Sequence, residues 1–152
     1  MKILMVCLGN ICRSPMAEGV LRKKIKEQEL KIEVDSCGTA DYHVGDSPDI
    51  RAQQTIRKHG HDISDLRGRQ FEIADFDRFD LIYAMDENNY FNILDQARSE
   101  EDKAKVNMIM NEVYSEQNIS VPDPYYGGIN GFEDTYEMLN LATEKILARV
   151  KN

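Results

Sequence analysis

The chain has 152 residues, and its 27 Asp and Glu outnumber its 19 Lys and Arg, which gives a net charge of −8 at pH 7. A chain of this length suits one domain, residues 1–152, with a sizeable buried core. The acidic balance, and the lack of a basic stripe or a platform of stacking aromatic residues, argue against nucleic acid as a partner.

An apolar run at residues 3–6 ends at Gly9 and Asn10. It is too short for a secretion signal or a membrane span, so neither is expected. The chain has three cysteines, and this odd number favours a reducing compartment. We therefore expect a cytoplasmic location.

The first predicted elements are a strand, a tight loop and a helix. The short apolar run at residues 3–6 suits a strand buried on both faces. Ser14 is expected to cap the helix and Pro15 to occupy its first position, where a missing N–H costs nothing. Apolar residues then recur at helical spacing until about Glu29. A loop closed onto a helix N-terminus directs several backbone N–H groups to one point, which makes an anion site.

Further strands and helices are predicted to alternate along the rest of the chain. Strands are expected at 30–36, 79–85 and 106–110. Helices are expected from Ser47-Pro48 to a C-cap at Gly60, from Asp86 through Ala97, and from Phe132 to Val150. The stretches expected to be loops are 40–46, 63–77 with a short helical turn, an acidic turn at 99–102, and 111–129.

This alternation predicts an α/β fold with a doubly wound, mostly parallel sheet flanked by helices. In such sheets the ligand crevice lies beyond the carboxyl ends of the strands. Cys7, Gly38, Asp86 and the segment after Met110 all follow predicted strands. They are therefore expected to meet at one edge of the sheet.

The chemistry of the first loop depends on a thiol and a guanidinium. Cys7 comes where the first strand ends, so its sulfur is expected to face the loop N–H groups. These donors, the helix dipole and Arg13 favour thiolate over thiol, and the Ser14 hydroxyl is placed to donate to the sulfur. The planar fork of Arg13 matches two phosphate oxygens.

The loop thus predicts nucleophilic phosphoryl transfer, with phosphate held by Leu8, Gly9, Asn10, Ile11, Cys12 and Arg13. No Gly-Lys-Ser/Thr follows the glycine, as an ATPase phosphate loop would require.

A thiolate that attacks a phosphate ester needs an acid to protonate the departing oxygen. Asp123 lies between two prolines, which stiffen the backbone around its carboxyl group. Tyr125 and Tyr126 follow it and suit the wall of a pocket that receives an aromatic ring. Alone, this segment would be interpreted as a turn with surface tyrosines. Its combination with the Cys7 loop favours a catalytic acid.

Four segments together resemble the low-molecular-weight protein tyrosine phosphatase family. They are Cys7-Leu-Gly-Asn-Ile-Cys-Arg-Ser-Pro, Asp35-Ser-Cys-Gly-Thr, Ala84-Met-Asp and Asp123-Pro-Tyr-Tyr-Gly, which occur in the family's order. The resemblance covers essentially the whole chain. It implies a four-stranded parallel sheet and hydrolysis of phosphotyrosine through a phosphocysteine, with neither a metal nor a cofactor.

The resemblance also implies roles for the reacting groups. Cys7 resembles the family's nucleophile, and Arg13 resembles its phosphate clamp. Asp123 resembles the acid that protonates the phenolate and then the base that activates water. Ser14 resembles the hydroxyl that steadies the thiolate and helps it leave.

Other matched positions are implied to support these groups. Asn10 resembles the residue that holds the loop in a strained, left-handed conformation, with Ser36 beside it. Asp86 resembles the carboxylate that orients Arg13, although helix capping also explains it. Tyr125 and Tyr126 match a tyrosine pair that is itself phosphorylated in some relatives. Cys12 matches a second cysteine that forms a disulfide with the nucleophile under peroxide in relatives, whereas a filler cysteine is the simpler interpretation.

Three positions depart from the family pattern. Cys37 replaces the usual alanine and is interpreted as a small buried residue. Tyr42 stands on the pocket rim where many bacterial members carry tryptophan. Leu66 falls near the position at which some members carry a histidine that supports the loop asparagine. The three histidines show no spacing that suits a metal site.

The expected partners are a phosphotyrosine-containing protein or peptide, a tyrosine kinase among them, and phosphate or another oxyanion as an inhibitor. Arsenate reductase is an alternative that shares this loop, but its further redox cysteines are missing because no cysteine follows Cys37. A phosphate- or phosphotyrosine-binding module is a second alternative. Such a module would have lost the acid, whereas Asp123 is present.

Overall fold

The computed structural model describes residues 1–128 and 130–151. Within these residues, one sheet is formed by four strands: β1 (Lys2–Cys7), β2 (Glu33–Gly38), β3 (Leu81–Ala84) and β4 (Val106–Met108). The strand order is β2-β1-β3-β4, and every pair is parallel. The predicted α/β fold with a doubly wound, four-stranded parallel sheet is therefore confirmed.

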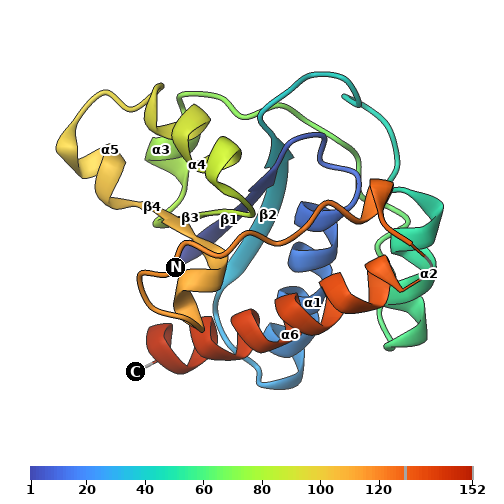
Figure 1. Ribbon diagram of the computed structural model, residues 1–152. Coiled ribbons are helices and arrows are strands. Elements are labelled where there is room, and N and C mark those ends of the chain that lie inside the picture. Colours follow the sequence, from blue (N-terminus) through green and yellow to red (C-terminus); the bar gives the residue numbers. More distant parts are fainter. Residues whose placement is uncertain (129, 152) are drawn as a thin grey trace.

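Helices cover both faces of this sheet, as Figure 1 shows. On one face lie α1 (Arg13–Glu27) and α6 (Gly131–Val150), with α2 (Ile50–Lys58) packed against both. The other face carries α3 (Asp75–Arg78), α4 (Glu87–Leu94) and α5 (Glu100–Ala104). Two short 3₁₀ turns, Ile109–Glu112 and Pro124–Tyr126, lie in the stretch after β4.

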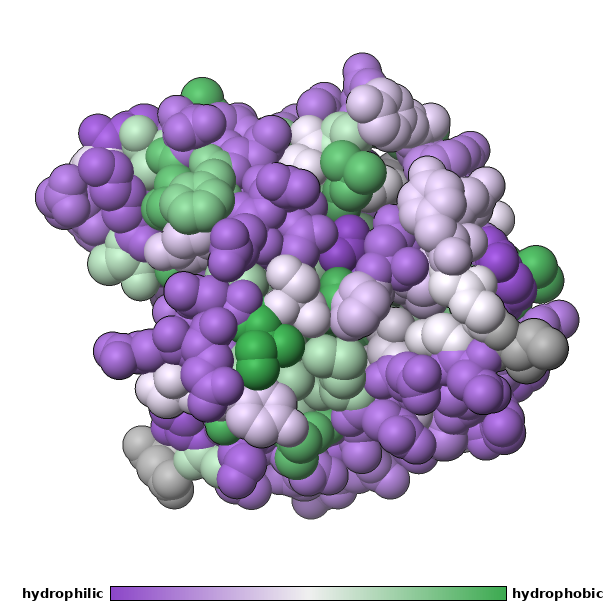
Figure 2. All heavy atoms as spheres, viewed as in Figure 1, coloured by the Kyte–Doolittle hydropathy of each residue, from purple (hydrophilic) through white to green (hydrophobic). Residues whose placement is uncertain are grey.

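The central strand β1 supplies both hydrophobic cores. Ile3 and Met5 point to the core under α1 and α6, whereas Leu4 and Val6 point to the core beside Phe76. Successive side chains of a strand face opposite sides, so an uninterrupted apolar run is buried on both. This burial fixes β1 and places the loop that follows it. Figure 2 shows that hydrophilic residues cover most of the face in view, with hydrophobic residues in small separate patches.

Two predicted helix starts are wrong. Helix α1 begins at Arg13 and has no side-chain cap, because the Ser14 hydroxyl bonds to other partners inside the fold. Helix α2 begins at Ile50 rather than at Ser47-Pro48, and Asp49 caps it by accepting a hydrogen bond from the Arg51 N–H.

Gly60 does end the second helix, as predicted. It has a φ of 91°, which a residue without Cβ adopts at little cost. Its N–H and that of His61 bond back to the carbonyls of Arg57 and Ile56, which closes the last turn of α2.

The predicted acidic turn at 99–102 is also wrong, because this segment starts α5. The Ser99 hydroxyl accepts a hydrogen bond from the Asp102 N–H, and Asp102 is buried in an ion pair with Arg98. Strand β4 ends at Met108, two residues earlier than expected, because the backbone then tightens into a 3₁₀ turn. Residues 129 and 152, the ends of the predicted 111–129 loop and of the predicted domain, lie outside the described residues. Among the described residues, no helix is both long and apolar enough to cross a membrane.

Candidate active site

The loop between β1 and α1, residues 8–12, lies at the carboxyl edge of the sheet. The N–H groups of Thr39 and Ala40, just after β2, donate to the carbonyls of Cys7 and Leu8 at 2.9 and 3.0 Å. On the other side of the loop, the Ile11 carbonyl accepts a hydrogen bond of 2.8 Å from the Asp49 N–H. The loop, called here the phosphate loop, is therefore fixed to β2 and to the start of α2.

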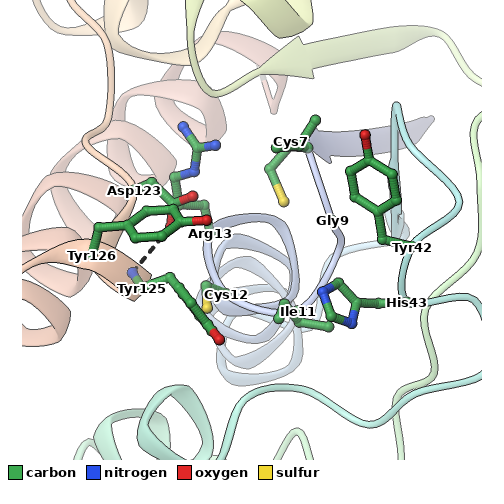
Figure 3. Close-up of a pocket in the computed structure, with 11 residues that line it drawn as sticks. Cys7, Gly9, Ile11, Cys12, Arg13, Tyr42, His43, Asp123, Tyr125 and Tyr126 are labelled. Atoms are coloured by element: carbon green, nitrogen blue, oxygen red, sulfur yellow. Dashed lines mark hydrogen bonds between the residues drawn. The ribbon is translucent and has the colours of Figure 1, made fainter.

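The Cys7 sulfur points into the pocket above this loop (Figure 3). The Asn10 N–H donates to it at 3.3 Å, and the Ser14 hydroxyl oxygen lies 3.0 Å from it. The sulfur therefore has two hydrogen-bond partners at the floor of the pocket, and cysteine reacts as a nucleophile in its thiolate form. Cys12 lines the same pocket, but burial raises the pKa of its thiol well above the usual range. The Cys12 thiol therefore holds its proton more firmly than an exposed cysteine does.

Asn10 holds the loop in its shape. Its φ of 58° places it in the left-handed region, which asparagine tolerates better than most residues. The side-chain amide donates to the hydroxyls of Ser14 at 2.8 Å and Ser36 at 3.0 Å. Its carbonyl oxygen accepts a hydrogen bond of 3.1 Å from the Arg69 N–H. One buried side chain therefore ties the loop to α1, to β2 and to the chain before α3.

Arg13 is positioned from two other elements. Its Nη1 donates to the Asp86 carboxylate at 2.7 Å and to the Val121 carbonyl at 2.9 Å, and only 4% of the residue is exposed. Asp86 also accepts a hydrogen bond from the Asn89 N–H, so it caps α4 as well as orienting Arg13. Both of these Arg13 bonds use Nη1, so within the described part of the chain Nε and Nη2 have no protein partner and are free to donate to a ligand.

The pocket above the loop has a volume of about 180 Å³. Asp123, Tyr125 and Tyr126 border one side of it, and Tyr42 and His43 border the other (Figure 3). The Tyr125 N–H donates to the Asp123 carboxylate at 3.0 Å. A carboxyl group therefore stands at the mouth of a pocket whose floor carries a thiol and a guanidinium.

The family comparison agrees with this geometry. Residues 2–152 match the family model described as low molecular weight phosphotyrosine protein phosphatase. The chain belongs to this family. A Synechocystis protein named for the same family is 48% identical over 149 residues, which are 97% of this chain and 94% of that protein. The human low molecular weight phosphotyrosine protein phosphatase is 38% identical over 138 residues, 89% of this chain and 86% of its own.

Solved structures of similar proteins share the whole architecture. A protein tyrosine phosphatase from Entamoeba histolytica, crystallised with Hepes in its active site, is 38% identical with a TM-score of 0.92. That alignment covers 99% of this chain and 97% of the other. A Drosophila arginine phosphatase is 32% identical, also with a TM-score of 0.92, and the alignment covers 100% and 99% of the two chains.

The structure brings the residues expected of a phosphatase of this family to one place. Those lining the pocket are Cys7, Leu8, Gly9, Ile11, Cys12, Arg13, Tyr42, Asp123, Tyr125 and Tyr126. Those behind it are Asn10, Ser14, Ser36 and Asp86. Cys37 is fully buried on the opposite face of the sheet from Cys7 and takes no part in the pocket. Within the described residues, no group of three or more His, Cys, Asp or Glu is placed to hold a metal ion.

Sequence reasoning missed two supports of Asn10. Glu18 accepts a hydrogen bond of 2.6 Å from the Ser36 hydroxyl, pairs with Arg22, and is buried, which raises the pKa of its carboxyl group. Glu18 lies in the half of α1 that is mostly buried, and an acidic residue at such a position was the signal for a polar support. Leu66 packs against the core, and the Arg69 N–H supplies a donor to Asn10 instead. A backbone donor of this kind leaves no trace in the sequence.

Proposed function

We propose that this protein hydrolyses phosphotyrosine monoesters through a phosphocysteine intermediate on Cys7. One observation carries the proposal: the Cys7 sulfur sits in the pocket with the Asn10 N–H at 3.3 Å and the Ser14 hydroxyl at 3.0 Å. Family membership supports the same reaction.

In the first step, the Cys7 thiolate attacks phosphorus while the loop N–H groups and Arg13 hold the equatorial oxygens of the phosphoryl group. The phosphorus–oxygen bond to the tyrosine breaks as the sulfur–phosphorus bond forms. Asp123 gives its proton to the departing phenolic oxygen. Because Arg13 is already anchored by Asp86 and Val121, it needs little reorganisation when charge builds up.

In the second step, Asp123 acts as the base. It takes a proton from a water molecule, whose oxygen attacks the phosphocysteine and releases inorganic phosphate. The Ser14 hydroxyl stabilises the departing sulfur as a thiolate, since it lies within hydrogen-bond distance of it. Phosphate and other oxyanions are therefore inhibitors that occupy the same loop.

Cys12 gives the site a route back from oxidation. Peroxide oxidises the Cys7 thiolate to a sulfenic acid and is reduced to water, and the Cys12 thiol then attacks that sulfur, releasing a second water. The resulting Cys7–Cys12 disulfide prevents irreversible oxidation. Both cysteines line the same pocket and neither is paired in the structure. Peptide mapping after peroxide treatment tests this disulfide, and a Cys7 sulfinic acid as the main product would contradict it.

The substrates are phosphotyrosine-bearing proteins or peptides, a tyrosine kinase among them. The pocket mouth is exposed and bordered by Tyr42, Tyr125 and Tyr126, which suits an aromatic ring on a protein surface. All three cysteines are free thiols, which supports a reducing, cytoplasmic location.

The reaction is tested with three peptides of one sequence that carry phosphotyrosine, phosphoserine or phosphoarginine, with EDTA present. Phosphoarginine is included because a similar structure is that of an arginine phosphatase. We expect phosphate release from the phosphotyrosine peptide to be fastest, and Cys7→Ser to abolish it while the circular dichroism spectrum stays unchanged.

Each component of the proposal has its own contradicting result. Faster phosphate release from the phosphoarginine peptide would show that phosphoarginine, not phosphotyrosine, is the preferred substrate class. Activity in Cys7→Ser would show that the reaction does not pass through a phosphocysteine. Peptide retention without phosphate release would favour a binding module. Thiol-dependent reduction of arsenate would favour an arsenate reductase, for which this chain has no cysteine after Cys37.

A further inference from the structure

The start of α2 lies between the phosphate loop and the segment that carries Asp123. Asp49, the cap of α2, uses its backbone N–H to bond to the Ile11 carbonyl of the phosphate loop at 2.8 Å. Its carboxylate holds the Arg51 guanidinium by two hydrogen bonds, 3.0 Å from Nε and 2.9 Å from Nη2. A two-point bond between a planar guanidinium and a carboxylate fixes the orientation of both groups. Arg51 therefore projects from a turn that is itself attached to the catalytic loop.

The same guanidinium lies over two aromatic rings. Its central carbon is 5.2 Å from the centre of the Tyr125 ring and 4.8 Å from that of Phe132. Cations at such distances are attracted to the electron-rich face of an aromatic ring. Tyr125 belongs to the segment after Asp123, and Phe132 belongs to the first turn of α6. Arg51 thus links α2 to the chain on both sides of residues 127–130.

Asp123 depends on Tyr125 for its position. Within the described residues, the one hydrogen bond of its carboxylate comes from the Tyr125 N–H, at 3.0 Å (Figure 3). Pro124 is buried, but the two tyrosines that follow it are held less firmly by burial, because Tyr125 and Tyr126 are 46% and 84% exposed. The contact of Arg51 with the Tyr125 ring is therefore a restraint on Tyr125 that adds to the burial of Pro124.

We propose that Asp49 and Arg51 form a clip that positions Asp123 over the phosphate loop, with Arg51 acting through Tyr125. Arg51 is a positioning residue in this proposal, since it touches neither the reacting phosphorus nor the nucleophile. The proposal rests on the proposed function, because it concerns the acid of that reaction. The hydrogen bonds from Arg51 also lower the pKa of the Asp49 carboxyl, so the pair is ionised at neutral pH.

The test measures kcat/KM for a series of aryl phosphates whose leaving groups become steadily more basic. A well-placed acid matters most for the most basic leaving oxygen. Arg51→Ala is therefore expected to lower kcat/KM about tenfold for phenyl phosphate and little for p-nitrophenyl phosphate. The inhibition constant of inorganic phosphate should stay unchanged. Arg51→Lys retains a cation near the rings and should recover part of the loss.

Arg57→Ala is the matched control, because Arg57 lies on the same helix and, among the described residues, its side chain makes only an exposed ion pair with Asp62 at 3.7 Å. It should leave the whole series unchanged. Asp49→Asn keeps a side chain that caps α2 but weakens the grip on Arg51, so it should give a smaller loss of the same kind.

Two results would overturn the clip. Arg51→Ala with the wild-type dependence on leaving-group basicity would show that Asp123 is positioned without it. An equal loss on every substrate, with weaker phosphate inhibition, would place the damage in the phosphate loop. In both cases the wild-type reaction and the Cys7→Ser result stand, so failure of the clip is distinguishable from failure of the proposed function.

Discussion

The phosphate loop with the start of α1 and the segment that carries Asp123 face each other across one pocket, but they are held in different ways. Asn10, Arg13 and Ser14 are buried and bonded to β2, to the start of α4 and to the chain before α3. In the part of the chain that the structure describes, Asp123 has one backbone donor, and Tyr125 and Tyr126 after it are 46% and 84% exposed. The groups proposed to bind phosphate are thus built into the core, whereas the proposed acid stands nearer the surface.

This difference predicts that substitutions on the two sides of the pocket affect folding stability and turnover differently. A buried polar network that loses one member leaves unsatisfied donors or acceptors and destabilises the fold. The half-buried carboxylate of Asp123 accepts its hydrogen bond from a neighbouring backbone N–H, so its removal should cost less. Substitutions in the phosphate loop should therefore change both turnover and unfolding, whereas those in the Asp123 segment should change turnover alone.

Arg13→Lys should give the largest effect. A lysine cannot make the two-point contact with phosphate, nor keep both Asp86 and the Val121 carbonyl satisfied in the same geometry. We expect kcat/KM on a phosphotyrosine peptide to fall about 10³-fold, with a lower midpoint of thermal unfolding. Wild-type turnover in this variant would contradict the role of the guanidinium.

Asp123→Asn should come next and should sharpen the comparison most. We expect turnover of a phosphotyrosine peptide to fall about 10²-fold, because the departing phenolate is no longer protonated. The inhibition constant of phosphate and the thermal unfolding midpoint should both stay at wild-type values. A large fall in the unfolding midpoint would break the distinction between the two sides of the pocket.

Asn10→Ala should act mainly on the fold. It removes the bonds to Ser14, Ser36 and the Arg69 N–H and places alanine at a φ of 58°. We expect unfolding in urea to become easier by about 2–4 kcal/mol and turnover to fall about tenfold. Asn10→Gly is the control, since it relieves the backbone strain but not the lost bonds. Equal recovery of both quantities in Asn10→Gly would show that strain, not bonding, sets the cost.

Glu18→Gln should give the smallest effect, visible only as a dependence on pH. Burial raises the pKa of Glu18 in the folded chain, so its contribution to stability is complete below its unfolded pKa and is lost as the pH rises through the folded pKa. Glutamine does not titrate, yet it still accepts the Ser36 hydrogen bond. As the pH rises from acidic to neutral, the free energy of unfolding in urea should therefore increase for the variant relative to the wild type, by on the order of 1 kcal/mol. A difference that does not vary with pH would show that the Glu18 pKa is not raised.

Much of the fold followed from local patterns in the sequence. The apolar run of β1 and the glycine after α2 each had a clear physical signature, and both were placed correctly. Helix starts were harder, because a serine suits both a cap and a buried network. Ser14 looked like a cap and serves the Cys7 sulfur, whereas Ser99 looked like part of a solvated turn and caps α5.

The site was predictable where the chemistry needs particular side chains. Cys7, Arg13 and Asp123 were predicted as nucleophile, clamp and acid, and the structure brings all three to one pocket. Supports made by the backbone could not be predicted, since any residue supplies a carbonyl or an N–H. The Val121 carbonyl on Arg13 and the Arg69 N–H on Asn10 are of this kind. The Arg51 contact with Tyr125 joins residues far apart in sequence and appears only when the chain is folded.

The central claim is that phosphate passes through the Cys7 sulfur. The most direct test mixes Asp123→Asn with p-nitrophenyl phosphate, denatures the protein within milliseconds and locates any covalent phosphoryl group by mass spectrometry. Since this leaving group departs without an acid but hydrolysis of the intermediate lacks its base, the phosphocysteine should accumulate. We predict a single phosphoryl group on Cys7. Its absence during turnover, or its presence on another residue, would contradict the account.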